Sequence, residues 1–177
     1  MDRSLIDRRL GELFADRRPT RWVTRARPKI DRIACPWLIR RFLDPDAVIL
    51  YVPTAEVFEV ARREGAVAFD IPDAPFTHDG EQCSFDAFLK AFGLTDPGLT
   101  ALAPIVRGAD TDRHDLAPQS SGLHALSIGL TILFDDDQAL LAQGLIVYDA
   151  FYAWATKARG ERHDWRPETM TEGRPLK

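Results

Sequence analysis

The chain has 177 residues, of which 45% are hydrophobic and 28% are charged, and its formal net charge is −4. This composition is that of an ordinary globular protein and argues against a wholly basic nucleic-acid binder. Two cysteines are too few for a disulfide scaffold, and no apolar run approaches the roughly 20 residues needed to span a bilayer. We therefore expect a single cytoplasmic domain over residues 1–177, with reduced thiols and no membrane partner.

The first half of the chain alternates between strand and helix patterns. After an N-terminal segment (1–19), the expected elements are a helix over 3–15, strands over 21–25, 47–52 and 67–70, and helices after Asp31 and over 54–63. Asp31 and Thr54 are the expected helix caps, and Pro36 suits the first turn of the helix after Asp31. This order predicts an α/β fold: a small, mostly parallel three-stranded β-α-β-α-β unit with right-handed crossovers.

The second half reads as helical. A Pro- and Gly-containing loop over 71–82 leads to four expected helices, over 84–92, 97–107, 119–134 and 136–157, and the chain ends in a polar tail over 160–177. Because these helices are rich in apolar residues, we expect them to pack against the β-α-β-α-β unit. A ligand pocket is expected between the two halves.

Positive charge is concentrated in one segment. Residues 17–41 contain nine Lys or Arg and one acid, Asp31, a net charge of +8 in an acidic chain. Such asymmetry favours an anionic ligand, and Arg32, Arg40 and Arg41 are the predicted oxyanion-binding residues because guanidinium groups make forked hydrogen bonds. Two alternatives stay open: a nucleic-acid-binding face, or arginines that pair with the acidic remainder of the same chain.

Potential metal ligands gather in three places. His78 and Glu81 lie in the loop before residue 84, Asp110 follows an expected helix end, and His124 lies in an apolar helix. Together they predict a mixed histidine–carboxylate site for a transition metal whose identity is unknown. An open coordination position there would instead make the protein a metal-dependent hydrolase or oxidoreductase. Equally open is a structural role, with hydrogen-bonded histidines and a solvated Asp110.

The two cysteines are candidate reactive thiols. Cys35 lies beside positive charge, which lowers a thiol pKa, whereas Cys83 lies among acids, which raise it. We expect Cys35 to be the more reactive if both are reachable. The competing interpretation is that Cys35 is buried and inert.

Four segments in the same order resemble the chromate-resistance protein family, the C-terminal domain of the regulator found beside bacterial chromate-efflux transporters. They are residues 29–42, 78–86, 106–110 and 148–154, and the resemblance covers roughly residues 20–156. It implies a bacterial sensor or binding domain, with a small anion such as chromate as ligand and a fused or partner regulatory domain. Full-length regulators of this kind carry a further DNA-binding region. Only about twenty residues precede the match, so we expect no specific DNA binding by this chain alone.

Overall fold

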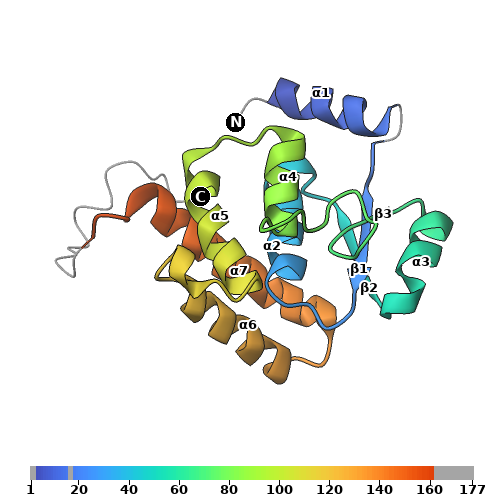
Figure 1. Ribbon diagram of the computed structural model, residues 1–177. Helices are drawn as coiled ribbons and strands as arrows, with labels where there is room; N and C mark the ends of the chain where they lie inside the picture. Colours follow the sequence, from blue (N-terminus) through green and yellow to red (C-terminus); the bar gives the residue numbers. More distant parts are fainter. Residues whose placement is uncertain (1–2, 16–17, 162–177) are drawn as a thin grey trace.

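A computed structural model describes residues 3–15 and 18–161 (Figure 1). The helices are α1 (Arg3–Phe14), α2 (Asp31–Leu38), α3 (Val57–Glu64), α4 (Ser84–Phe92), α5 (Pro97–Asp110), α6 (Ser120–Leu133) and α7 (Asp137–Lys157). The strands are β1 (Arg21–Arg25), β2 (Val48–Val52) and β3 (Val67–Ala68). A π-helical turn (Ile39–Leu43) extends α2, and 3-10 turns cover Thr54–Glu56 and His114–Leu116. None of the described helices is both long and apolar enough to cross a membrane.

The three strands form one parallel sheet in the order β2-β1-β3. β1 is central: Val23 pairs with Leu50 of β2 on one side and with Ala68 of β3 on the other. The predicted α/β class and the β-α-β-α-β unit are therefore confirmed.

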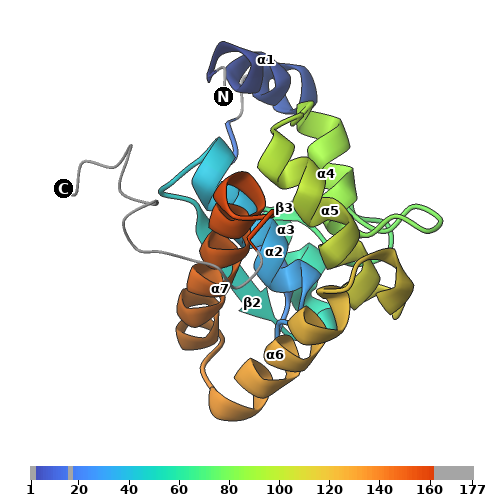
Figure 2. The same cartoon turned by 90° about the vertical axis from the view of Figure 1, so that its left-hand side faces the viewer.

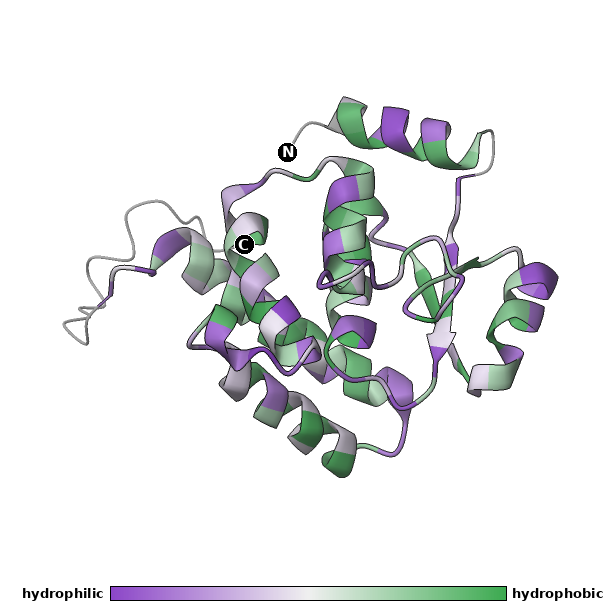
Figure 3. Cartoon of the chain, in the orientation of Figure 1, coloured by the Kyte–Doolittle hydropathy of each residue, from purple (hydrophilic) through white to green (hydrophobic). Residues whose placement is uncertain are grey.

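Side-chain alternation along the strands gives the sheet two covered faces. Val23 points to a small core formed with Val57 and Val60 of α3. Its neighbour Trp22 points to the main core, which α2, α4, α5 and α7 fill from the opposite face. α3 thus stands alone on one side of the sheet in Figure 1, and Figure 2 shows α5, α6 and α7 grouped on the other. Figure 3 shows that the hydrophilic residues of α3 lie on its outer side.

Several local expectations need correction. Asp31 is the first residue of α2, and its side chain does not cap that helix. Thr54 does not cap α3 either, because a 3-10 turn precedes the helix. The third strand ends at Ala68 because Asp70 takes a positive φ of 51° and leaves the extended conformation. Of the predicted polar tail, residues 162–177 lie outside the described residues.

Pro36 lies inside α2 rather than in its first turn. Proline has no N–H, so the carbonyl of Arg32, four residues earlier, loses its helical partner. The hydroxyl of Tyr51, from β2, donates to that carbonyl at 2.6 Å. Tyr51 of the sheet thereby replaces the hydrogen bond that Pro36 removes from the helix.

We expect Tyr51→Phe to lower the free energy of unfolding by about 1–3 kcal/mol, because it leaves the Arg32 carbonyl without a partner. In a Pro36→Ala background the alanine N–H can bond that carbonyl, so the same Tyr51→Phe change should cost clearly less. Urea denaturation of the four proteins in this double-mutant cycle measures the difference. Equal costs in the two backgrounds would mean that the hydroxyl does not replace the missing N–H.

Candidate functional site: an aspartate–histidine cluster

Three carboxylates and an imidazole converge beside the carboxyl ends of β1 and β3. We call Asp31, Asp70, His78 and Asp110 the aspartate–histidine cluster. Asp31 opens α2 after β1, Asp70 follows β3, His78 comes from the loop before α4, and Asp110 ends α5. In open parallel sheets, ligands bind beyond the carboxyl ends of the strands, so the topology brings these residues to an edge suited to a site.

The imidazole of His78 is the centre of the cluster. Its Nε2 lies 3.0 Å from Oδ2 of Asp110, 3.6 Å from Oδ2 of Asp31 and 3.6 Å from Oδ1 of Asp70. One ligand atom from each of Asp31, His78 and Asp110 lies within 4.8 Å of the others. Such spacing suits ligands that share one cation.

Asp31 is held at the base of the cluster. It is fully buried, and its carboxylate accepts hydrogen bonds from the backbone N–H groups of Ser84 and Phe85, the first residues of α4. Burial raises the pKa of Asp31 well above its usual range, and the charges of Asp110 and Asp70 raise it further. A positive charge beside Asp31 would therefore stabilise its ionised form.

Asp70 has cationic partners of its own. Its Oδ2 lies 2.9 Å from Arg25 and 3.3 Å from Arg32, and Ser84 Oγ donates to its Oδ1 at 2.9 Å. Burial by itself would raise the pKa of Asp70, but hydrogen bonds from His78, Ser84 and Arg25 outweigh it and lower the pKa. Asp70 thus has two arginine partners, whereas the cationic group beside Asp31 and Asp110 is His78.

His78 is the positive charge available to Asp31 and Asp110. The hydrogen bonds to Asp110 and Asp70 raise the pKa of His78 to about 10, against the effect of burial. Asp110 is the last residue of α5. A protonated His78 therefore places one positive charge between Asp110 and Asp31.

Two backbone positions beside the cluster are strained. Ile30 has φ 37° and Asp70 has φ 51°, and a positive φ is a genuine outlier for a β-branched residue such as isoleucine. Strained residues of this kind gather at functional sites. The position of these two residues therefore supports a functional role for the cluster.

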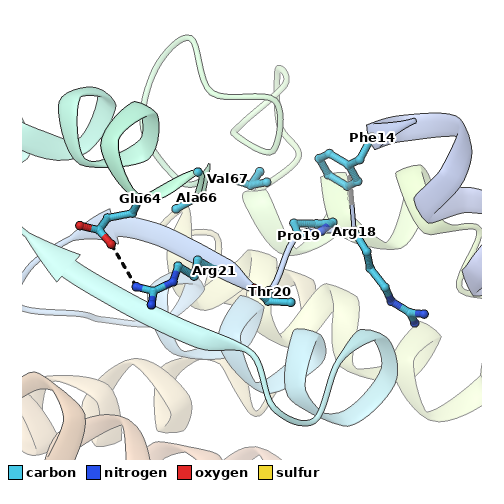
Figure 4. A pocket seen from close by; sticks show the side chains of 9 residues that line it. Phe14, Arg18, Pro19, Thr20, Arg21, Glu64, Ala66 and Val67 are labelled. Atoms are coloured by element: carbon cyan, nitrogen blue, oxygen red, sulfur yellow. Dashed lines mark hydrogen bonds and ion pairs between the residues drawn. The ribbon is translucent and has the colours of Figure 1, made fainter. Parts of the chain in front are cut away.

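The cluster reaches the surface through His78. Its side chain is 42% exposed, whereas that of Asp31 is 0% exposed, and His78 lines a surface hollow of about 370 Å³ together with Gln82 and Lys90. A larger hollow, of about 560 Å³, lies beside the opposite, amino ends of the strands, where Arg21 pairs with Glu64 (Figure 4). Of these two hollows, only the one lined by His78 borders the cluster.

The four predicted metal ligands do not lie together. His78 and Asp110 meet in the cluster, but His124 lies next to His114, with their Nδ1 and Nε2 atoms 3.1 Å apart. Gly80, with φ 59°, turns the loop, and Glu81, next to it, is 90% exposed and pairs with Arg113. Metal binding by these residues stays a prediction, and the structure divides them among three places.

The three predicted oxyanion-binding arginines also separate. Arg32 donates to the carbonyl of Ala26 and pairs with Asp70. Arg40 donates to a backbone carbonyl, and Arg41 makes two hydrogen bonds to Asp149 of α7. Arg40 and Arg41 line a shallow hollow without Arg32, so an anion there would meet only two of the three.

Most of the described basic segment pairs with acids elsewhere in the chain. The pairs are Arg18–Asp7, Arg21–Glu64, Arg25–Asp70, Arg27–Asp135, Arg32–Asp70 and Arg41–Asp149. Arg17 lies outside the described residues. Of the interpretations left open by the sequence, pairing within the chain is the one that this geometry supports.

Both thiols are buried. Burial raises the pKa of Cys35 well above its usual range, and Asp31 and Asp70 raise it further. Burial and Asp31 likewise raise the pKa of Cys83. Burial and the carboxylates of the cluster therefore outweigh the positive charge that lies near Cys35 in the sequence.

Sequence analysis missed Asp31 and Asp70 as members of the site. Asp31 was interpreted as a helix cap and Asp70 as the end of a strand. A usable signal was present, because both follow strands of the expected parallel sheet and such positions share one edge.

Fold and site together define a small α/β domain with a carboxylate–histidine cluster at the carboxyl edge of a parallel sheet. Residues 22–155 match the family model of the ChrB C-terminal domain. The chain is also 36% identical to Protein ChrB of Cupriavidus metallidurans over 141 residues, which cover 78% of this chain and 41% of that protein. The chain therefore belongs to the ChrB C-terminal domain family. No solved structure gives a significant match.

Proposed function

We propose that this chain is a cation-sensing domain of a chromate-resistance system, and that the aspartate–histidine cluster is its metal site. The family match supports the link to chromate resistance. Because the chain spans 41% of the ChrB protein that it matches, a regulatory role of the longer protein enters only as part of this proposal.

The observation that carries the proposal is the convergence of three carboxylates on one imidazole nitrogen, at 3.0–3.6 Å. Arg25 and Arg32 balance Asp70, which leaves Asp31 and Asp110 with His78 as the cationic group beside them. A protonated His78 neutralises one of them. A divalent ion, with His78 neutral as its ligand, neutralises both.

The ligand set indicates the kind of metal. Two carboxylates and one imidazole suit a divalent first-row transition metal such as Zn²⁺ or Mn²⁺. Ser84 and Phe85 donate backbone hydrogen bonds to Asp31 and so fix its orientation, as outer partners of metal ligands commonly do. His78 lies at the surface, where it can receive the ion.

Chromate itself does not suit this cluster, because a dianion would meet the carboxylates of Asp31 and Asp110. Oxyanion binding by Arg32, Arg40 and Arg41 therefore remains a separate proposal. It would require Arg41 to leave Asp149, to which it is hydrogen bonded. A metal ion at the cluster requires His78 to release its proton, but it breaks no arginine–carboxylate pair.

The test is metal binding by protein purified without a histidine tag. After treatment with a chelator, calorimetric titration with Zn²⁺ and Mn²⁺ should show saturable binding that raises the melting temperature. Loss of an outer partner of a metal ligand commonly weakens metal binding by about 10- to 100-fold. Because His78→Ala and Asp110→Asn remove a ligand itself, each should weaken binding at this site by more than that.

Asp79→Asn is the matched control, because Asp79 is exposed and adjacent to His78 but lies outside the cluster. It should leave the affinity unchanged. Unaltered titrations for both His78→Ala and Asp110→Asn would rule the proposal out, as would the absence of saturable binding in the wild-type protein.

A further inference from the structure

A second group of ligand-type side chains lies apart from the cluster. It comprises Asp112, His114 and His124, which we call the paired-histidine group. One ligand atom from each residue lies within 4.8 Å of the others. Asp112 follows α5, His114 opens a 3-10 turn, and His124 lies in the second turn of α6. Apart from the cluster, it is the one such group among residues 3–15 and 18–161.

The two imidazoles meet through their ring nitrogens. His114 Nε2 lies 3.1 Å from His124 Nδ1, and the ring planes are inclined at 70°. Two nitrogen ligands at about 2.0–2.1 Å from a tetrahedral zinc ion lie about 3.3 Å from each other, and closer at smaller ligand angles. The observed separation is that of a hydrogen bond between the two rings, and it is close to the separation of two ligands on one metal, which would take the place of the shared proton.

A carboxylate completes three ligands. Asp112 Oδ1 lies 3.7 Å from His114 Nε2, and the Asp112 side chain is 89% exposed. An exposed side chain can close the remaining few tenths of an ångström by rotating. Asp112 has φ 57°, a conformation that aspartate tolerates better than most residues. The backbone bend after α5 thus brings this carboxylate beside the histidines.

Close packing holds the paired-histidine group in place. A Cβ on Gly108 would come within 2.7 Å of the carbonyl oxygen of Arg113 and would clash with Ser120 Oγ. Only glycine at this position lets the segment that carries His114 approach α5 so closely. Ser120 Oγ donates to the carbonyl of Ile105 and ties the start of α6 to α5. The nitrogens are therefore positioned by the scaffold, as a preformed site requires.

We propose that Asp112, His114 and His124 form a second metal site, with two imidazoles and one carboxylate and an open position for water. Imidazole-rich sites suit Zn²⁺, Ni²⁺, Cu²⁺ and Co²⁺, whereas the carboxylate-rich cluster also suits harder ions such as Mn²⁺. The two sites differ in chemistry, and the second does not depend on the proposed function of the first.

Zn²⁺ titration of the tag-free, chelator-treated full chain tests this proposal. The wild type should bind at one more site than His124→Ala or His114→Ala. Zn²⁺ should also shift the NMR resonances of both imidazoles. His124→Gln, which keeps a polar side chain of similar length, serves as a second variant if alanine disturbs α6, and it too should lose the site.

His78→Ala separates the two sites, because it should leave the shifts of the His114 and His124 resonances intact. Asp115→Asn is the matched control: Asp115 adjoins His114 but pairs with Arg113, and its loss should not change the stoichiometry. The proposal is overturned if the stoichiometry survives His114→Ala and His124→Ala, or if saturating Zn²⁺ leaves both imidazole resonances unshifted. Either result would leave the aspartate–histidine cluster untouched.

Discussion

Asp70→Ala is expected to lower the free energy of unfolding by about 3–5 kcal/mol, the usual cost of removing one partner from a buried ion pair. Asp70 is 4% exposed and holds Arg25 at 2.9 Å and Arg32 at 3.3 Å. The side chain of Arg32 is only 15% exposed, so solvent cannot replace the lost carboxylate. Ser84 Oγ loses its acceptor as well.

Asp31→Asn should behave differently in the metal-free protein, although both carboxylates belong to one cluster. Burial, Asp110 and Asp70 all raise the pKa of Asp31, so the ionised form is disfavoured and a neutral amide relieves repulsion. Its single oxygen can still accept the hydrogen bond from Ser84, and only the long bond from Phe85, at 3.4 Å, is lost. We expect a change of no more than about 1 kcal/mol, or a gain in stability.

Urea denaturation in the presence of a chelator measures both variants, and Asp135→Ala provides the control. Asp135 is fully exposed, so its replacement should change stability by no more than about 0.5 kcal/mol. If Asp31→Asn proves as costly as Asp70→Ala, the two carboxylates are equally stabilised. The charge argument for a cation beside Asp31 then fails.

Trp37→Ala is expected to cost about 3–5 kcal/mol, as is usual for large aromatic side chains removed from a core. Trp37 is fully buried in α2. Its ring lies 5.5–6.5 Å, centroid to centroid, from the rings of Phe42, Phe85, Tyr148 and Tyr152. These contacts join α2 to α4 and α7, so the loss affects the junction between the sheet half and the helical half.

Two further variants divide the contribution of Trp37. Trp37→Phe keeps most of the packing but loses the Nε1 hydrogen bond to Asp149, so it should cost less than Trp37→Ala. Arg41→Ala removes the other partner of Asp149, in a pair that is half exposed, and should cost about 0.2–1 kcal/mol. Urea midpoints at an unchanged m-value measure all three. A loss below about 1.5 kcal/mol for Trp37→Ala would show that the junction repacks.

The sequence by itself determined which segments form helices and strands, and it determined the class of the fold. Residues 48–52 are apolar or aromatic, three of them β-branched, and end before Pro53, and residues 84–92 end at Gly93, which has φ 61°. Such signals are local, because strand and helix periods depend on residues two to four positions apart. Because helices separate the short strands along the chain, a parallel sheet was the arrangement that agreed with this order of elements. The four family segments lie within these elements and their connections.

Only the tertiary structure decided which ligand-type residues meet. His78 and Asp110 could be singled out by residue type, but their partners Asp31 and Asp70 come from other connections of the sheet. His124 was grouped with His78, although it faces His114, ten residues before it. Periodicity shows which face of an element is apolar, and the packing of α4, α5 and α6 decides which polar residues share a space.

The same reason explains the basic segment and the thiols. The net charge of residues 17–41 does not show which acids pair with its arginines. The acids that pair with Arg25 and Arg41 lie 45 and 108 residues away along the chain. Positive charge near Cys35 in the sequence did not imply a reactive thiol, because the fold buries it among carboxylates. Burial and long-range pairing depend on contacts between distant segments, and a single sequence does not encode these contacts in any local pattern.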